Sequence, residues 1–165
     1  MPTLIQALQD PDPGVREQVA DALGRVGPAE QAVVRALSQA LHDPEGTVRM
    51  AAAEGLGRIG SLAVPPLIQL LQATETRDRL AAAWVLGRIG LEARGAVPTL
   101  ASRLQDPEVI IRQAVAQSLG ALGTGAREAL PALNQVLLNQ EIAAHAVKAF
   151  ASITVDLQDL SLIHI

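Results

Sequence analysis

The side chains that could act in catalysis or bind a metal are few and isolated in this chain of 165 residues. Cysteine is absent, which excludes thiolate nucleophiles, cysteine metal ligands and disulfide bonds. The three histidines, His42, His145 and His164, lie far apart in the sequence, and none of them is followed by a glutamate. Because lone histidines are seldom metal ligands, we expect neither a metal nor a cofactor.

Two further catalytic patterns are also missing. No serine lies in the Gly-x-Ser-x-Gly turn that presents the nucleophile of many hydrolases. Residues 55–60 read Gly-Leu-Gly-Arg-Ile-Gly and match a phosphate-binding loop by letter. That loop must follow a strand and open a helix, whereas this segment ends a predicted helix. We therefore expect that the chain is not an enzyme.

Arginines are the charged residues with regular spacing. One row, at the start of a recurring helix, consists of Arg16, Arg49, Arg79 and Arg112. The preceding turns contain Asp10, Asp43 and Asp106. Periodic charges at a fixed place usually serve the repeat itself, so we interpret these residues as an Asp–Arg ladder that ties each turn to its neighbour. The alternative is a row of anion-binding arginines. A second row, near the helix end, consists of Arg25, Arg58 and Arg88. Cations at this place suit the helix dipole, and they could also contact an acidic partner.

An internal repeat explains this spacing. The segment Leu-Gly-Arg-Val-Gly at residues 23–27 recurs as Leu-Gly-Arg-Ile-Gly at 56–60 and 86–90, and as Leu-Gly-Ala-Leu-Gly at 119–123. A degenerate copy, Phe-Ala-Ser-Ile-Thr, occupies residues 150–154. The copies begin 30–33 residues apart. Repeats of this length are typical of solenoids, in which each unit is one supersecondary element.

Each unit reads as two helices. The first opens near a proline and ends at a turn such as Asp-Pro-Asp-Pro, residues 10–13. The second buries one face with helical spacing, as Val15, Val19 and Leu23 show, and ends at a glycine. We expect the small residues of the second helix to allow close helix approach, including the column Gly24, Gly57, Gly87 and Gly120. Since one hairpin cannot bury its apolar face alone, the sequence predicts an all-α, right-handed superhelix of about five hairpins.

We expect a single array over residues 1–159, as a fragment of a longer protein, with repeats near 2–33, 34–64, 65–97, 98–130 and 131–155. Residues 160–165 read Leu-Ser-Leu-Ile-His-Ile and break the pattern. A transposon end used in preparing sequencing libraries would encode this hexapeptide, so we interpret it as a non-native tail. The alternative is a genuine apolar tail that docks on the last repeat.

The pattern Asp-Pro-x-x-x-Val-Arg, an alanine-rich helix and Leu-Gly-Arg-Ile-Gly resembles the HEAT repeat, in particular its phycobilisome-lyase HEAT-like branch in bacteria. The resemblance covers about residues 2–155 and implies an α-solenoid. Family members include bilin lyase subunits, phycobilisome degradation factors and many interaction scaffolds. Deoxyhypusine hydroxylase is also HEAT-like and binds iron through His-Glu pairs, but this chain contains no His-Glu dipeptide.

Composition and resemblance together favour a cytoplasmic, non-catalytic scaffold that binds another protein. A net charge of −4 does not favour nucleic acid or acidic membranes as partners. No apolar run has transmembrane length, and the N-terminus does not read as a signal peptide. A bilin lyase subunit or phycobilisome-handling factor is the alternative, and a stand-alone enzyme is a third possibility that the missing motifs disfavour.

Columns that vary between repeats predict the binding surface. Two such columns lie four residues apart on one face of the second helix: Glu17, Met50, Leu80 and Gln113, with Asp21, Glu54, Trp84 and Gln117. In HEAT-like superhelices the second helices line the concave surface, so the resemblance implies a groove there. We expect this groove to be acidic at its N-terminal part and apolar around Met50, Leu80 and Trp84, with the tryptophan as the anchor. Alternatively, Trp84 fills a gap between neighbouring helices.

Overall fold

The computed structural model describes residues 2–26 and 31–162, with side chains from residue 3 to 155 within those ranges. In these residues every element is helical and there is no strand, which confirms the expected all-α fold. The long second helices are α2 (Pro13–Val26), α4 (Gly46–Ile59), α6 (Thr76–Ile89), α8 (Val109–Ala121) and α10 (Ala143–Leu162). The first helices are α1 (Pro2–Gln6), α3 (Gln31–Ala40), α5 (Val64–Leu70), α7 (Val97–Arg103) and α9 (Leu130–Val136). Short 3₁₀ helices connect them: η1 (Ala7–Gln9), η2 (Gly60–Ala63), η3 (Gly90–Ala96) and η4 (Gly123–Ala129).

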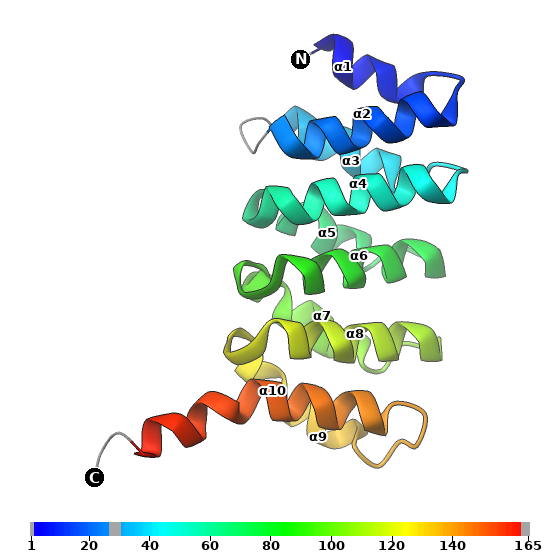
Figure 1. The fold of residues 1–165 in the computed structure, drawn as a ribbon. Helices are drawn as coiled ribbons and strands as arrows, with labels where there is room; N and C mark the ends of the chain where they lie inside the picture. The colour runs from blue at the N-terminus through cyan, green and yellow to red at the C-terminus, as the bar shows by residue number, and fades with distance from the viewer. Residues whose placement is uncertain (1, 27–30, 163–165) are drawn as a thin grey trace.

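The helices form a superhelix of two layers (Figure 1). The second helices α2, α4, α6, α8 and α10 lie side by side in one layer, and the shorter first helices lie behind them. Hairpins stack in chain order from the N-terminus at one end to α10 at the other. The exposed faces of all five second helices therefore lie on the same side of the molecule, which we call the second-helix face.

Leucine columns form the core between the two layers. The second-helix column is fully buried in four successive repeats: Leu23, Leu56, Leu86 and Leu119. The facing column of the first helices is equally buried: Leu37, Leu67, Leu100 and Leu133. Burial of one leucine side chain contributes about 1.5–3 kcal/mol, so stacking of neighbours supplies most of the stability that one hairpin lacks.

Glycines end the second helices where the sequence predicts it. Gly60 follows α4 with φ of 73°, and Gly90 follows α6 with φ of 68°, a region that side chains with a Cβ avoid. Gly27, predicted to play this part after α2, lies outside the described residues. Of the tail 160–165, α10 includes residues 160–162, while 163–165 lie outside the described residues, so its non-native origin stays a prediction.

The turn between the two helices of a repeat is closed by a side-chain oxygen. The Asp43 Oδ1 accepts a hydrogen bond of 2.9 Å from the backbone N–H of Glu45, and Asp106 does the same for Glu108 at 3.1 Å. Asn139 takes this role in the last described turn. Such Asx turns fix the chain direction at the start of the second helix. The same aspartates are thereby held in place for contacts with the neighbouring repeat.

Small residues bring most neighbouring second helices into backbone contact. A Cβ built on Gly24 of α2 would overlap the Cα of Gly55 in α4. One on Gly87 of α6 would lie 3.0 Å from the Cα of Ser118, and one on Gly120 would lie 3.0 Å from the Cα of Ala149. The expected close approach is thus confirmed for the pairs α2–α4, α6–α8 and α8–α10.

Candidate functional site

The junction between α4 and α6 lacks the close backbone contact that the other second-helix pairs of the described residues make. A Cβ on Gly57 would have only the Cβ and Nε of Arg88 nearby, each at 3.7 Å, and no backbone atom of α6 within 4 Å. The prediction of close helix approach is therefore wrong at Gly57. The repeat places Val85 at the position that Gly55, Ser118 and Ala149 hold at the other junctions. A fully buried isopropyl group in place of a small residue keeps these two helices apart.

The segment that connects α4 to the next first helix also differs in length from its counterparts. The 3₁₀ helix η2, between α4 and α5, has four residues, whereas η3 and η4 have seven each. Repeat two is therefore joined to repeat three by a shorter segment than the later repeats are. Both differences fall at the same junction, and together they set its geometry apart from the rest of the array.

An apolar groove of about 400 Å³ lies between the two separated helices. We call it the α4–α6 groove; it is lined by Leu41, Gly46, Arg49, Met50, Ala53, Arg77, Leu80, Ala81 and Trp84. Its two largest apolar side chains are well exposed, with 61% of Met50 and 41% of Trp84 accessible to solvent. The structure thus brings together the three residues predicted as the apolar centre, and among the described residues no acidic side chain lines the groove.

Trp84 stands between this groove and a second hollow. The guanidinium carbon of Arg88 lies 4.9 Å from the centre of the indole ring, a cation–π arrangement that orients both side chains. Both residues also line a smaller hollow of about 200 Å³ between α6 and α8, together with Gln117. Trp84 therefore lies at the rim of both depressions and is partly exposed to solvent.

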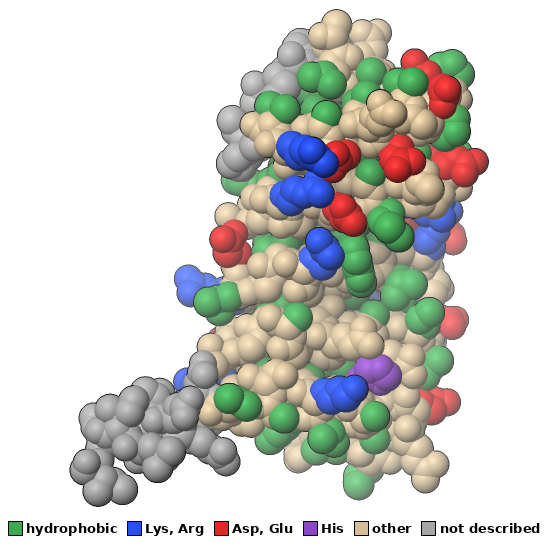
Figure 2. All heavy atoms as spheres, viewed as in Figure 1, with side chains coloured by type: hydrophobic (Ala, Val, Ile, Leu, Met, Phe, Trp, Pro, Cys, Tyr) green, Lys and Arg blue, Asp and Glu red, His purple; other side chains and the backbone are tan. Residues whose placement is uncertain are grey.

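The N-terminal part of the second-helix face carries paired charges. The Arg58 Nη1 lies 2.8 Å from the Asp21 Oδ1, and its Nη2 lies 3.3 Å from the Glu54 Oε2. Arg25 approaches the other Asp21 oxygen at 2.9 Å. The hydrogen bond from Arg58 holds the pKa of Asp21 below its ordinary value. Figure 2 shows basic and acidic side chains adjoining here, so this part of the face is more nearly neutral than the expected acidic surface.

The remaining predicted residues fall into two groups. Glu17 lies with Asp21, Met50 and Glu54 in a hollow of about 280 Å³ between α2 and α4. The Gln113 Nε2 instead donates a hydrogen bond of 3.0 Å to the backbone oxygen of Glu141, so it helps to tie α8 to the next turn. The predicted columns thus share one face, but they contribute to several separate depressions along it.

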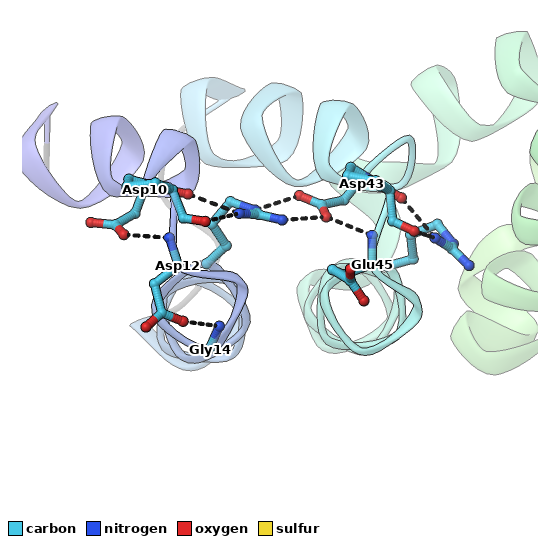
Figure 3. Close-up of polar contacts among 9 residues, drawn as sticks. Asp10, Asp12, Gly14, Asp43 and Glu45 are labelled. Carbon is cyan, nitrogen blue, oxygen red and sulfur yellow. Dashed lines mark hydrogen bonds and ion pairs between the residues drawn. The ribbon is translucent and has the colours of Figure 1, made fainter.

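The expected Asp–Arg ladder is present on the turn side of the array. The Arg16 Nε and Nη2 donate to the two Asp43 carboxylate oxygens at 2.8 and 2.9 Å. Its Nη1 donates to the backbone oxygens of Asp10 and Pro11 in its own turn (Figure 3). The hydrogen bonds between the Arg16 and Asp43 side chains raise the pKa of Arg16 and lower that of Asp43. Arg79 holds Asp106 in the same two-pronged way, at 2.9 and 3.1 Å.

The ladder is interrupted at Arg49. Its Nη1 donates to the backbone oxygens of Asp43 and Pro44, both at 2.7 Å, as the other arginines do in their own turns. In the next repeat, Ala73 replaces the aspartate that would supply the carboxylate. The backbone of Ala73 occupies the same place in its turn and accepts a hydrogen bond from Arg79. Among the described side chains, Arg49 has no ion-pair partner, although the sequence analysis counted it as a member of the ladder. The missing aspartate at residue 73 was visible in the sequence.

A contact between a histidine and a buried aspartate is also specific to this junction. Asp78 occupies a column that is otherwise apolar, as Val48 and Ile111 show, and only 6% of it is exposed. The His42 Nε2 lies 3.1 Å from the Asp78 Oδ2. The other oxygen, Oδ1, has no hydrogen-bond partner in the described part of the chain; the Arg77 Nε lies 4.0 Å from it. This polar contact sits directly beside the α4–α6 groove, because Arg77 lines that groove.

Within the described residues, no group of three His, Asp or Glu side chains lies close enough to hold a metal ion. The helices of this part of the chain are also too short or too polar to cross a lipid bilayer.

Comparison with solved structures shows the same fold in several proteins. The chain is similar to a protein in the complex of CpcE and CpcF of phycocyanin lyase from Nostoc sp. PCC7120, with 28% identity and a TM-score of 0.65 over 96% of this chain. It spans 66% of the length of that lyase chain. Human deoxyhypusine hydroxylase matches with 21% identity and a TM-score of 0.61, over 93% of this chain and 73% of the other.

A designed armadillo repeat protein in complex with the peptide (KR)4 also has this fold, with 19% identity and a TM-score of 0.58, over 91% of this chain and 80% of the other. A search of curated proteins finds no match. The family model of HEAT repeats matches residues 1–78 and 64–151, which together include most of the chain. The repeated hairpins, the leucine columns and this match agree, and the chain belongs to the HEAT repeat family.

Proposed function

We propose that this chain is a non-catalytic interaction scaffold that binds a protein partner on its second-helix face, with the main contact in the α4–α6 groove. The observation that carries the proposal is the exposure of Met50 and Trp84 around an apolar groove. Tryptophan is among the residues that most often dominate binding energy, and methionine is enriched at interfaces. The neighbouring charged residues of α2 and α4 would form the polar rim that surrounds such a contact.

Peptides selected from a random library test this proposal, because the chain contains a single tryptophan whose fluorescence reports directly on the groove. A peptide that binds there should change the Trp84 emission. The variants Trp84→Ala and Met50→Ala should each weaken binding, by about 2 kcal/mol or thirtyfold for the tryptophan, as measured by titration calorimetry because the first variant contains no tryptophan.

Leu138→Ala is a matched control, since Leu138 is an apolar side chain that is 93% exposed but lies outside the groove. Its affinity for the peptides should equal that of the unaltered chain. If the selected peptides bind the Trp84→Ala variant as tightly as the unaltered chain, the proposed contact is wrong.

A bilin lyase subunit, or another protein that handles the chromophores of phycobilisomes, is the second candidate. The similarity to a protein of the phycocyanin lyase complex, at 28% identity, supports it. Under this proposal the absorption band of a linear tetrapyrrole should shift when the pigment is mixed with the purified chain. The scaffold proposal expects an unchanged spectrum, so absorption spectroscopy separates the two.

A further inference from the structure

The ladder shows how this fold binds a carboxylate. In both intact steps, the arginine uses Nη1 to hold its own turn and uses Nε and Nη2 to hold both oxygens of the next aspartate. The Asp43 side chain in this position is 9% exposed, and that of Asp106 is fully buried. The geometry is a two-pronged, charge-assisted contact, which is among the stronger polar contacts in proteins.

Arg49 has the same arrangement of guanidinium donors as Arg16 and Arg79, but no aspartate of the next repeat accepts from it. Hydrogen bonds of 2.7 Å fix its Nη1 to its own turn, as in Arg16. Its Nε and Nη2 make no hydrogen bond within the described residues, because Ala73 replaces the aspartate. A methyl group therefore stands where Asp43 and Asp106 supply a carboxylate in the two intact steps.

This open position adjoins the α4–α6 groove. Arg49 lines the groove together with Arg77, while Met50, Leu80 and Trp84 supply the apolar surface and the part of the chain that the structure describes contributes no acidic residue to the lining. A ligand in the groove is thus offered an apolar surface with guanidinium groups beside it. Charge complementarity selects a negatively charged group for the position next to Arg49.

We propose that the groove binds a peptide segment of the protein partner in which an acidic residue adjoins large apolar side chains, and that the acidic side chain completes the interrupted ladder at Arg49. This inference rests on the proposed function, since it specifies the partner of the same groove. The apolar side chains of the segment pack against Met50, Leu80 and Trp84. The carboxylate takes the place that an aspartate at residue 73 would occupy.

The substitution Ala73→Asp tests the inference because it supplies the missing carboxylate from within the chain. The backbone N–H of Ala73 donates to the Leu70 oxygen at 3.1 Å, as that of Asp43 donates to Ala40 at 3.1 Å, so an aspartate here starts from the same turn geometry. Ala73→Asp should weaken binding of acidic peptides selected from a random library by about tenfold. Ala73→Ser, which adds no charge, is the matched control and should leave their affinity unchanged. Arg49→Gln should weaken binding to the same extent without any change at residue 73.

The peptides themselves supply the second arm of the test. Each selected peptide is compared with a version in which glutamate or aspartate is replaced by its amide. The amide should lose about tenfold in affinity for the unaltered chain and almost nothing for Arg49→Gln. Peptides that depend on Trp84 but show no such loss would overturn this inference and leave the scaffold proposal standing. Peptides whose binding does not depend on Trp84 would overturn both the inference and the scaffold proposal. If the chain instead associates with itself and Trp84→Ala abolishes this association, the groove binds a second copy of the chain and the inference is overturned.

Discussion

The Ser118 hydroxyl oxygen of α8 lies 2.6 Å from the backbone oxygen of Ala83 in α6, so the serine donates a hydrogen bond across the junction of two neighbouring helices. Ser118 is buried, and a carbonyl oxygen of its own helix, that of Ala114, lies 2.8 Å away. Val85 holds the equivalent position at the junction of α4 and α6. We infer that this single column of the repeat decides whether two neighbouring second helices come into backbone contact or stay apart.

Introducing valine at the contact should force α6 and α8 apart. We expect Ser118→Val to lower the free energy of unfolding by about 1–3 kcal/mol, the usual range for overpacking. Ser118→Ala, which keeps the space but loses the hydrogen bond, should cost about 1 kcal/mol. Urea unfolding followed by circular dichroism measures both. Equal stability of the two variants would contradict the steric explanation.

Two glycines of the same column provide a matched pair. Gly24→Ala places a Cβ against the backbone of Gly55, which cannot move without shifting a whole helix. We expect it to destabilise the chain by more than about 1 kcal/mol. In Gly57→Ala the new methyl group meets only the Arg88 side chain at 3.7 Å, so the higher helix propensity of alanine should make it neutral or stabilising, by up to about 1 kcal/mol. Thermal unfolding compares them, and a loss at Gly57 as large as at Gly24 would rule out the separated junction.

The ladder should contribute to stability through its buried members. Asp106→Ala removes a fully buried carboxylate and leaves the nearly buried Arg79 guanidinium unpaired, which should cost about 3–5 kcal/mol. Asp10→Ala is the control, because the Asp10 carboxylate closes its turn through the N–H of Asp12 but pairs with no arginine side chain in the described residues, and the backbone oxygen that accepts from Arg16 is kept in the variant. It should cost about 1 kcal/mol, the value of one hydrogen bond. Comparable losses in urea unfolding would show that the turn, and not the ladder, carries the effect.

Acid should weaken the ladder in a defined pH range. The hydrogen bonds from Arg16 lower the pKa of Asp43 in the folded chain below its ordinary value of 3.8. Folding therefore favours the ionised form, and this stabilisation is complete above pH 3.8 and lost as the pH falls through the lower, folded pKa. The variant Asp43→Asn should be less stable at neutral pH and show a shallower decline below pH 3.8, measured by urea unfolding across a pH series. Parallel declines would mean that other carboxylates control the acid response. Asp21 acts in the same direction, but its exposure to solvent screens the effect.

Trp84 and Leu86 lie on one helix but should respond differently to truncation. Leu86 is fully buried, and Leu86→Ala should cost about 2–5 kcal/mol in unfolding free energy. Trp84 is 41% exposed at the rim of the groove, so Trp84→Ala should cost less than Leu86→Ala and leave the helical circular dichroism unchanged. The fluorescence of the isolated chain should resemble that of a solvated tryptophan. A strongly blue-shifted emission with a large loss of stability would place Trp84 in the core.

The repeat columns made most of the fold predictable from the sequence. Leucines at one place in successive repeats indicated the core, and Leu56 and Leu86 are fully buried. Gly60 and Gly90 adopt the positive φ that their places after the second helices required. Such features depend on local conformation and on a pattern that occurs several times, so each copy supports the others.

The groove was only partly predictable, because it arises where one copy departs from the pattern. Gly57 and Arg49 match the other members of their columns in sequence, yet the contacts of each depend on the residue that faces it in the next repeat. Val85 and Ala73 are those facing positions: Val85 is the one large residue in a column of small ones, and Ala73 interrupts a column that otherwise has aspartate or asparagine. The exposure of Trp84 likewise depends on the distance between two helices that no local pattern specifies. Comparing facing residues across repeats, rather than residues within a column, would have indicated this junction.

The wide junction between α4 and α6 also bears on how the array loses its structure. In a stack of repeats, cooperativity depends on the contact between each pair of neighbours. Since α4 and α6 approach each other less closely than the other second-helix pairs of the described residues, the part up to α4 and the part from α5 onward are the units that should open independently. A ligand seated between Met50 and Trp84 touches both units. Its binding free energy would be added to the weakest interface, so that an occupied chain unfolds as one body.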